Sequence, residues 1–259
     1  MSSPSRPVTH LDKSAVLEAL FESWDDIDRL LSGISDDDWD KPSRVPTPEA
    51  GEVSGLAHVR NEIGAMNEAW VGAMRADSPA AMLERFRDIT GQRKAVLGAM
   101  SEEDWDAVGF TPAGPDSYGR FMRIRIFDCW LHEHDIRAAL SLPATDAELD
   151  SPAARFALDE VAGSMSFVVG KLGKAPDGAR VALELTGPLG RTIRVAVDGR
   201  AALVDEFEGS PTTSIRLDGL QFTRLCGGRP LCPARSPEIE FDGDAEVGQR
   251  IVDRLNYVI

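Results

Sequence analysis

The residue content of this 259-residue chain changes near residue 150, and the change limits the possible folds more than any other feature of the sequence. All five tryptophans precede that point, whereas the β-branched runs 180–186 and 192–198 follow it. The charge changes too: the first 150 residues hold 15 Lys and Arg against 28 Asp and Glu, and the remainder holds 13 against 15. A helical part followed by an α+β part is therefore expected. The predicted segments are a flexible tail (1–12), a helical domain (13–148) and an α+β domain (149–259).

Hydrophobic residues recur at three- and four-residue spacing through most of the first part, which indicates amphipathic helices with one buried stripe. The segment 31–40 is echoed at 97–106, since both copies contain a serine, a run of acids and then Trp-Asp. Each copy is expected to end a long helix and start a short one, because serine caps helices and acids favour a helix N-terminus. This predicts two helical hairpins packed as a four-helix bundle. The expected long helices cover 14–34, 54–76, 80–100 and 117–141.

The second part places β-branched runs between helical segments. Ser151 and Pro152 are typical of a helix start, with serine as the cap and proline as the first helical residue. Strands grouped between terminal helices indicate an α+β fold with a mostly antiparallel sheet covered on one face. The expected strands lie near 179–186, 191–198, 201–205, 213–217 and 238–242, and the expected helices cover 152–172, 218–227 and 244–256.

Composition excludes several classes of function. The formal charge of −15 would repel a nucleic-acid backbone, and no basic run offsets it locally. The sequence contains neither 18 consecutive apolar residues nor the apolar stretch of a signal peptide, so we expect a soluble, cytoplasmic protein without a membrane partner. Three cysteines are too few for a disulfide framework and are expected to be reduced. The sequence does not distinguish a monomer from a homodimer.

The segment 117–141 is apolar around most of its circumference but carries one polar stripe at helical spacing. A helix of this kind is expected to be largely buried, so the stripe is expected to need buried partners. Glu133 and His134 lie off this stripe and are expected on outer faces. The stripe comprises Arg125, Asp128, His132 and Asp135.

Asp128 and His132 are one helical turn apart, so a carboxylate and an imidazole can converge on one ion. His58, early in the second expected helix, is the candidate third ligand. Two histidines and one aspartate leave open coordination positions, as in catalytic zinc sites, although other divalent metals accept the same donors. The alternatives are an intrahelical ion pair or a hydrogen-bonded core histidine. Asp135 either orients the His132 ring or pairs with Arg125.

These residues resemble the mycothiol-dependent maleylpyruvate isomerase family, and the likeness covers nearly the whole chain. In the first part it is carried by Phe127-Asp-Cys-Trp-Leu-His-Glu-His-Asp-Ile-Arg137, by His58 in a Leu-Ala-His context and by Asp104-Trp105. In the second part it is carried by Leu185-Thr-Gly187, Val197-Asp-Gly-Arg200, Leu225-Cys-Gly-Gly-Arg229 and Leu255-Asn-Tyr-Val-Ile259.

The resemblance implies a DinB-like metal-binding four-helix domain followed by a domain similar to sterol carrier proteins. It assigns the metal ligands to His58, Asp128 and His132, and it implies mycothiol as the low-molecular-weight thiol. Two departures stand out: the segment 45–54 differs from the family's usual Gly-Trp-Thr/Ser-Val, and the carboxylate ligand, Glu in the isomerase itself, is Asp here. Asp is one methylene shorter, so the metal must lie closer to the helix or be held more loosely.

The resemblance implies a metal- and mycothiol-dependent isomerase or thiol transferase that acts on a small electrophile through a metal-activated thiolate. The alternative is a non-catalytic metal-containing protein that carries an apolar small ligand. Arg229, in a Gly-Gly-Arg-Pro loop, is predicted to line a cleft between the domains and to anchor a substrate carboxylate. The alternative for Arg229 is an ordinary surface turn.

Overall fold

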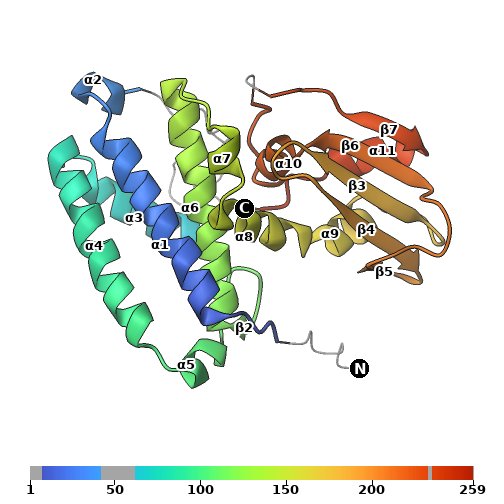
Figure 1. The fold of residues 1–259 in the computed structure, drawn as a ribbon, viewed down its shortest axis with the longest axis horizontal. Coiled ribbons are helices and arrows are strands. Elements are labelled where there is room, and N and C mark those ends of the chain that lie inside the picture. The colour runs from blue at the N-terminus through green and yellow to red at the C-terminus, as the bar shows by residue number, and fades with distance from the viewer. Residues whose placement is uncertain (1–7, 42–61, 233–234, 259) are drawn as a thin grey trace.

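The computed structural model describes residues 8–41, 62–232 and 235–258, and it places a helical part beside an α+β part (Figure 1). In the first part α4, α1 and α6 run side by side, with α3 behind them (Figure 1). This confirms the predicted four-helix arrangement. The second expected helix is seen from residue 62 onward, and its segment 54–61 lies outside the described residues. The long helices are α1 (Lys13–Ser32), α3 (Glu62–Met74), α4 (Pro79–Ala99) and α6 (Tyr118–Leu140).

The echoed segments form the two short helices that were expected after α1 and α4. Ser35 precedes α2 (Asp36–Trp39) in a capping box, and the Ser101 side chain accepts a hydrogen bond from the Asp104 amide at the start of α5 (Glu102–Asp106). A two-stranded ladder of β1 (Val108–Gly109) and β2 (Asp116–Ser117) then leads into α6. The Ser117 side chain caps α6 by accepting from the Arg120 amide.

The second part contains a five-stranded, mostly antiparallel sheet, as predicted. Its spatial order is β5-β4-β3-β6-β7, and only the central pair of β3 and β6 is parallel. The strands are β3 (Arg180–Thr186), β4 (Arg191–Asp198), β5 (Arg200–Leu203), β6 (Thr213–Asp218) and β7 (Glu240–Gly243). The helices are α7 (Asp146–Leu149), α8 (Pro152–Ala162), α9 (Met165–Phe167), α10 (Gly219–Cys226) and α11 (Ala245–Val252).

One helix differs from the sequence prediction. A single helix was expected over 152–172, but α8 ends at a Gly163 cap and the chain continues through α9 into a π-helical turn, η1 (Val168–Leu172). Gly170 in this turn lies against Ala201 of β5 so closely that a Cβ would stand 2.5 Å from the Ala201 methyl. The π-helical turn therefore lies with its backbone directly against the sheet at Gly170. The single helix expected from the sequence did not include this contact.

The two parts share one continuous hydrophobic core. Helix α8 packs against both α6 and α1, and it lies between the long helices and the sheet in Figure 1. A buried charge network reinforces this contact: Arg120, whose side chain is 2% exposed, pairs with Asp116 at 2.8 Å and with Glu160 of α8 at 2.9 Å. The proposed division at 148/149 stays a prediction, but α8 belongs to the packing of the helical part.

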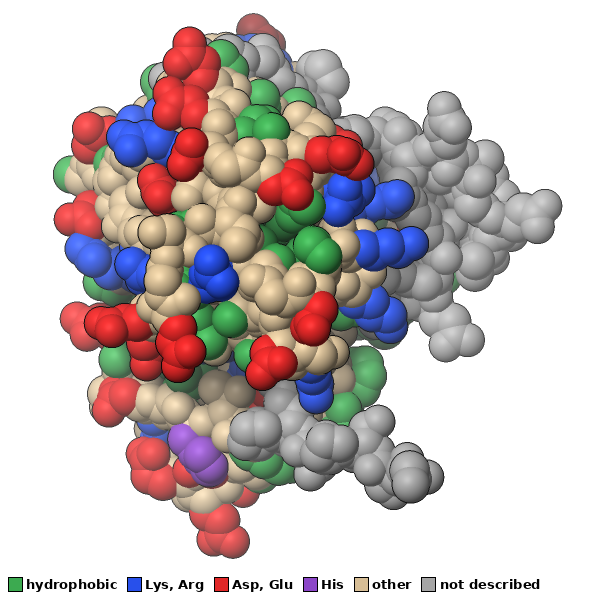
Figure 2. Space-filling view, turned by 90° about the vertical axis from the view of Figure 1, so that its right-hand side faces the viewer, with side chains coloured by type: hydrophobic (Ala, Val, Ile, Leu, Met, Phe, Trp, Pro, Cys, Tyr) green, Lys and Arg blue, Asp and Glu red, His purple; other side chains and the backbone are tan. Residues whose placement is uncertain are grey.

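The surface carries charges of both signs. Figure 2, which views the end of the molecule on the right of Figure 1, shows acidic and basic side chains interspersed over this face, with one group of basic side chains on its right-hand side. Within the described ranges, none of the helices has the length and apolar content needed to cross a membrane.

Candidate metal and thiol site on helix α6

Helix α6 brings the predicted Asp128 and His132 together on one face. The Nε2 atom of His132 lies 3.4 Å from the Oδ1 atom of Asp128, and its Nδ1 atom lies 3.4 Å from the Oδ2 atom of Asp135. Arg125 pairs with Asp128 at 2.7 Å. Of the two roles considered for Asp135, the structure therefore favours contact with the His132 ring, because Arg125 is held by Asp128 instead.

The exposure of this stripe corrects one expectation from the sequence. The side chains of Asp128 and His132 are 45% and 56% exposed, so they open to solvent, whereas Asp135 of the same stripe is buried as expected. Glu133 and His134, expected on outer faces, are buried instead. Glu133 is satisfied there by Arg137 at 2.7 Å, and the His134 ring packs edge-on against Trp130. Apolar periodicity located the helix but did not show which polar residues face its neighbours.

The two carboxylates control the electrostatics of the imidazole. Hydrogen bonding to Asp128 and then to Asp135 raises the pKa of His132 to about 9, against an opposing effect of burial. Burial also opposes ionisation of Asp128, but His132 and Arg125 outweigh it and its pKa lies below the ordinary value. A cation that binds these two side chains must therefore displace the proton on His132.

Arg229 reaches this stripe from the loop after α10. Its Nη2 atom lies 2.9 Å from the Oδ2 atom of Asp135, its Nε atom also donates to this carboxylate, and its Nη1 atom donates to the Gly227 carbonyl at 2.6 Å. Both members of the pair are largely buried, with Asp135 6% and Arg229 14% exposed. Arg229 therefore does not sit on an ordinary surface turn; it is clamped by a carboxylate of α6.

The loop that carries Arg229 fits closely against α6. A Cβ at position 227 would lie 2.4 Å from the Cδ2 atom of Leu131, so glycine is required for the close approach. Gly228 has a φ of +71°, a left-handed conformation that glycine adopts without strain. The two glycines thus allow the loop after α10 to pack closely against α6, and in this position the Arg229 guanidinium reaches Asp135.

The structure unites three of the four predicted site residues. Asp128, His132 and Arg229 are linked through Asp135, which the sequence suggested either as an orienting group for His132 or as a partner of Arg125. His58 lies outside the described residues. Within 8–41, 62–232 and 235–258, no three His, Cys, Asp or Glu side chains are grouped so that they could hold a metal ion. The Asp128–His132 pair supplies one oxygen and one nitrogen donor, and Asp135 beside Nδ1 is the outer partner that metal-bound histidines usually have.

The nearby cysteines do not offer a thiolate. Burial, reinforced by the neighbouring Asp128, raises the pKa of Cys129 to about 11. Burial likewise raises the pKa of Cys226 well above its ordinary value. Both thiols are therefore protonated near neutral pH and act as packing groups.

Comparison with known proteins identifies relatives of both parts. The domain model described as "Mycothiol maleylpyruvate isomerase N-terminal domain" matches residues 44–137, and the "MDMPI C-terminal domain" model matches residues 155–250. A crystal structure of the mycothiol-dependent maleylpyruvate isomerase is 15% identical, with a TM-score of 0.53 over 90% of this chain and 93% of that one. A point mutant of that enzyme gives the same identity and TM-score, over 85% and 90%. At this identity the two structures show a shared fold. No curated protein gave a match.

Proposed function

Because the chain belongs to the mycothiol maleylpyruvate isomerase family, whose two domain models together span most of its length, we propose that it is a mycothiol-dependent isomerase or thiol transferase acting on a small electrophile. The observation that carries this proposal is the linked set on α6, in which a half-exposed Asp and His lie side by side and are connected through Asp135 to Arg229 of the second part. A small substrate and a thiol are the expected partners.

Asp128 and His132 are the proposed ligands of a divalent metal, with zinc the first candidate and His58 the third ligand. The donor set fits such an ion, because an imidazole nitrogen and a carboxylate oxygen stand on one accessible face. When bound, the metal would supply a positive charge that lowers the pKa of a thiol and makes it nucleophilic at neutral pH.

The surrounding residues orient these donors. Asp135 accepts from the Nδ1 side of the His132 ring, which directs Nε2 toward Asp128. Arg125 fixes the other Asp128 oxygen at 2.7 Å. The Arg229 guanidinium uses three of its N–H groups on Asp135 and Gly227, and each Nη nitrogen carries a second N–H. We assign those remaining donors to the carboxylate of a substrate.

The test is metal analysis of the purified full chain, followed by assay of mycothiol-dependent conversion of maleylpyruvate and other small electrophiles. Asp128→Ala and His132→Ala should lose the divalent metal and the thiol-dependent turnover together. His10→Ala is the matched control, because His10 is an exposed histidine paired with an aspartate, Asp106. Equal metal content in His132→Ala and the wild type would overturn the metal site. Metal without any thiol-dependent turnover would overturn the enzymatic proposal.

A further inference from the structure

The second face of the sheet is polar, and no helix of the described residues covers it. Along β3 and β4 the side chains alternate, so that Val181, Leu183 and Ile193 face the core while their neighbours face outward. The outward residues are mainly charged or small, and strand register places them in cross-strand rows. This face lies on the opposite side of the sheet from the core that packs against α6, so it is separate from the site described above.

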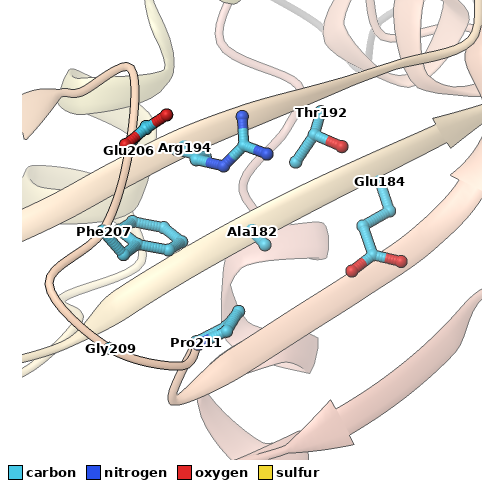
Figure 3. Close-up of a pocket in the computed structure, with 8 residues that line it drawn as sticks. All are labelled: Ala182, Glu184, Thr192, Arg194, Glu206, Phe207, Gly209 and Pro211. Atoms are coloured by element: carbon cyan, nitrogen blue, oxygen red, sulfur yellow. The ribbon is translucent and has the colours of Figure 1, made fainter.

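A pocket of about 400 Å³ opens on this outward face. Figure 3 shows Ala182 at its floor, with Arg194 and Thr192 along one side, Glu184 at one end, and Phe207 and Pro211 opposite them. Phe207 and Pro211 belong to the loop between β5 and β6, which forms a wall over the sheet. The volume lies within the range of small-molecule sites.

The charged groups of this pocket have no partner in the part of the chain that the structure describes. Among the residues that the structure describes, the side chains of Arg194, Glu184 and Glu206 form neither a hydrogen bond nor an ion pair, although Arg194 and Glu184 are half-buried. Neighbouring arginines differ: Arg191 on the same strand pairs with Asp159 at 2.6 Å, and Arg216 lies 3.7 Å from Glu240. Half-buried charges without partners are costly unless a ligand or water satisfies them.

Strand register places the two charges on one diagonal of the pocket. Arg194 stands opposite Ala182, and Thr192 stands opposite Glu184, so Arg194 and Glu184 are diagonal neighbours, and the structure records no ion pair between them. The small floor residue leaves a space that is bounded by Arg194 on one side and by Glu184 at one end, with Glu206 at the other end near Phe207 (Figure 3). Phe207 and Pro211 give the same space an apolar wall (Figure 3).

We propose that this pocket binds an amino acid zwitterion with an apolar side chain. The carboxylate pairs with the Arg194 guanidinium and accepts from the Thr192 hydroxyl, the ammonium group donates to Glu184, and the side chain packs against Phe207 above Ala182. A guanidinium and a hydroxyl are the usual partners of a carboxylate, and an ammonium group needs an acceptor of opposite charge.

The experiment is calorimetric titration of the full chain with L-alanine, L-valine, L-leucine and L-phenylalanine. Two analogues of L-leucine each lack one charge: 4-methylpentanoate has no ammonium group and 3-methylbutylamine has no carboxylate. At least one amino acid should bind, and in the leucine series both analogues should bind at least about tenfold more weakly, because each leaves one half-buried charge unpaired.

Variants distinguish binding in this pocket from non-specific binding to charged residues elsewhere on the surface. Arg194→Gln and Ala182→Leu should each weaken amino acid binding at least about tenfold, the first by removing the cation and the second by filling the floor. Arg200→Gln is the matched control, since Arg200 is an exposed arginine on the neighbouring strand β5 and lies outside the pocket lining. The proposal is overturned if none of the four amino acids binds, if the analogues bind as tightly as leucine, or if both pocket variants bind like the control.

Discussion

Helix α6 carries two charge networks that differ in one respect. Near its start, Arg120 is enclosed with Asp116 and Glu160, and all three side chains are almost completely buried. About two turns further on, a second network pairs the Asp128 carboxylate with Arg125 on one side and His132 on the other. The side chains of this second network are about half exposed. The first network joins α6 to α8 and has no access for a ligand, whereas the second presents a nitrogen and an oxygen donor to solvent. Alternating charges on a helix therefore indicate function only where their donors remain accessible.

The largest expected effect comes from removing the partner helix of the buried network. A chain that ends at residue 148 lacks α8, so Arg120 and Arg123 lose Glu160, and α6 loses apolar cover. We expect it to keep its helical circular-dichroism signal but to unfold at much lower urea concentration than a chain that ends at residue 163. Equal midpoints for the two truncated chains would show that the buried network does not join α8 to the bundle.

Removing the central cation of the buried network should have the next largest effect. In Arg120→Met the carboxylates of Asp116 and Glu160 stay buried without their shared partner, which is expected to cost about 3–5 kcal/mol of unfolding free energy. Urea denaturation measures this cost. Arg125→Met, in the exposed network, is the matched comparison and should change the free energy by less than about 1 kcal/mol. Similar losses of unfolding free energy in the two variants would show that the buried and the exposed network contribute equally to stability.

The buried network should also make the protein sensitive to acid. Burial works against ionisation of Asp116, but hydrogen bonds from Arg120, Thr9 and Ser117 outweigh it, and its pKa lies well below the ordinary value. Because the folded pKa is the lower one, ionised Asp116 stabilises the fold above about pH 4, and this contribution is lost as the pH falls further. Asp116→Asn should flatten the acid limb of a stability–pH curve, and an acid limb as steep as that of the wild type would contradict this role of Asp116.

A smaller loss is expected where the Arg229 loop meets α6. Gly227→Ala forces a Cβ against the buried Leu131 side chain and should cost about 1–3 kcal/mol. It should also displace Arg229 from Asp135, so thiol-dependent turnover should fall more than stability alone explains. Gly98→Ala on α4 is the control, because nothing lies within 4 Å of its added Cβ. If Gly227→Ala turned over substrate as fast as the wild type, the position of the Arg229 loop would not matter for activity.

The smallest effect on stability is expected in the exposed network. His132→Ala removes two contacts of 3.4 Å from a half-exposed side chain and should change the unfolding free energy by less than about 1 kcal/mol in metal-free protein. With divalent metal added, the wild type should gain thermal stability and the variant should not, because metal binds the folded state alone. Scanning calorimetry with and without zinc measures both effects. A large loss without metal would place His132 among the structural residues.

The sequence predicted those features that depend on local pattern. The echoed serines gave the starts of α2 and α5, and the spacing of Asp128 and His132 gave their common face. Helix α6 is largely buried, as predicted, but the exposure of Asp128 and His132 and the burial of Glu133 and His134 were predicted wrongly. The reason is that apolar residues lie all around this helix, which packs against both α1 and α8. Periodicity alone does not show where such a helix leaves an opening.

The contact of Arg229 with Asp135 could not be derived from local pattern. The two residues are 94 positions apart, and their meeting depends on how the loop after α10 fits over Leu131. Its only signal was the glycine pair before Arg229, which indicates a tight turn but not its neighbour. The pocket over Ala182 was missed for a similar reason, because its charges come from separate strands and its wall from a distant loop.

The same long separation has a consequence during biosynthesis. At roughly 5–20 residues per second, Arg229 leaves the ribosome about 5–20 s after Asp135. Helix α6 can form in that interval, but Asp135 then contacts His132 without its second partner. The nascent protein therefore passes through a stage in which the helical part is assembled and the site is incomplete. Because the proposed site includes the Asp135–Arg229 pair, we expect the proposed activity to appear only after the second part has been translated.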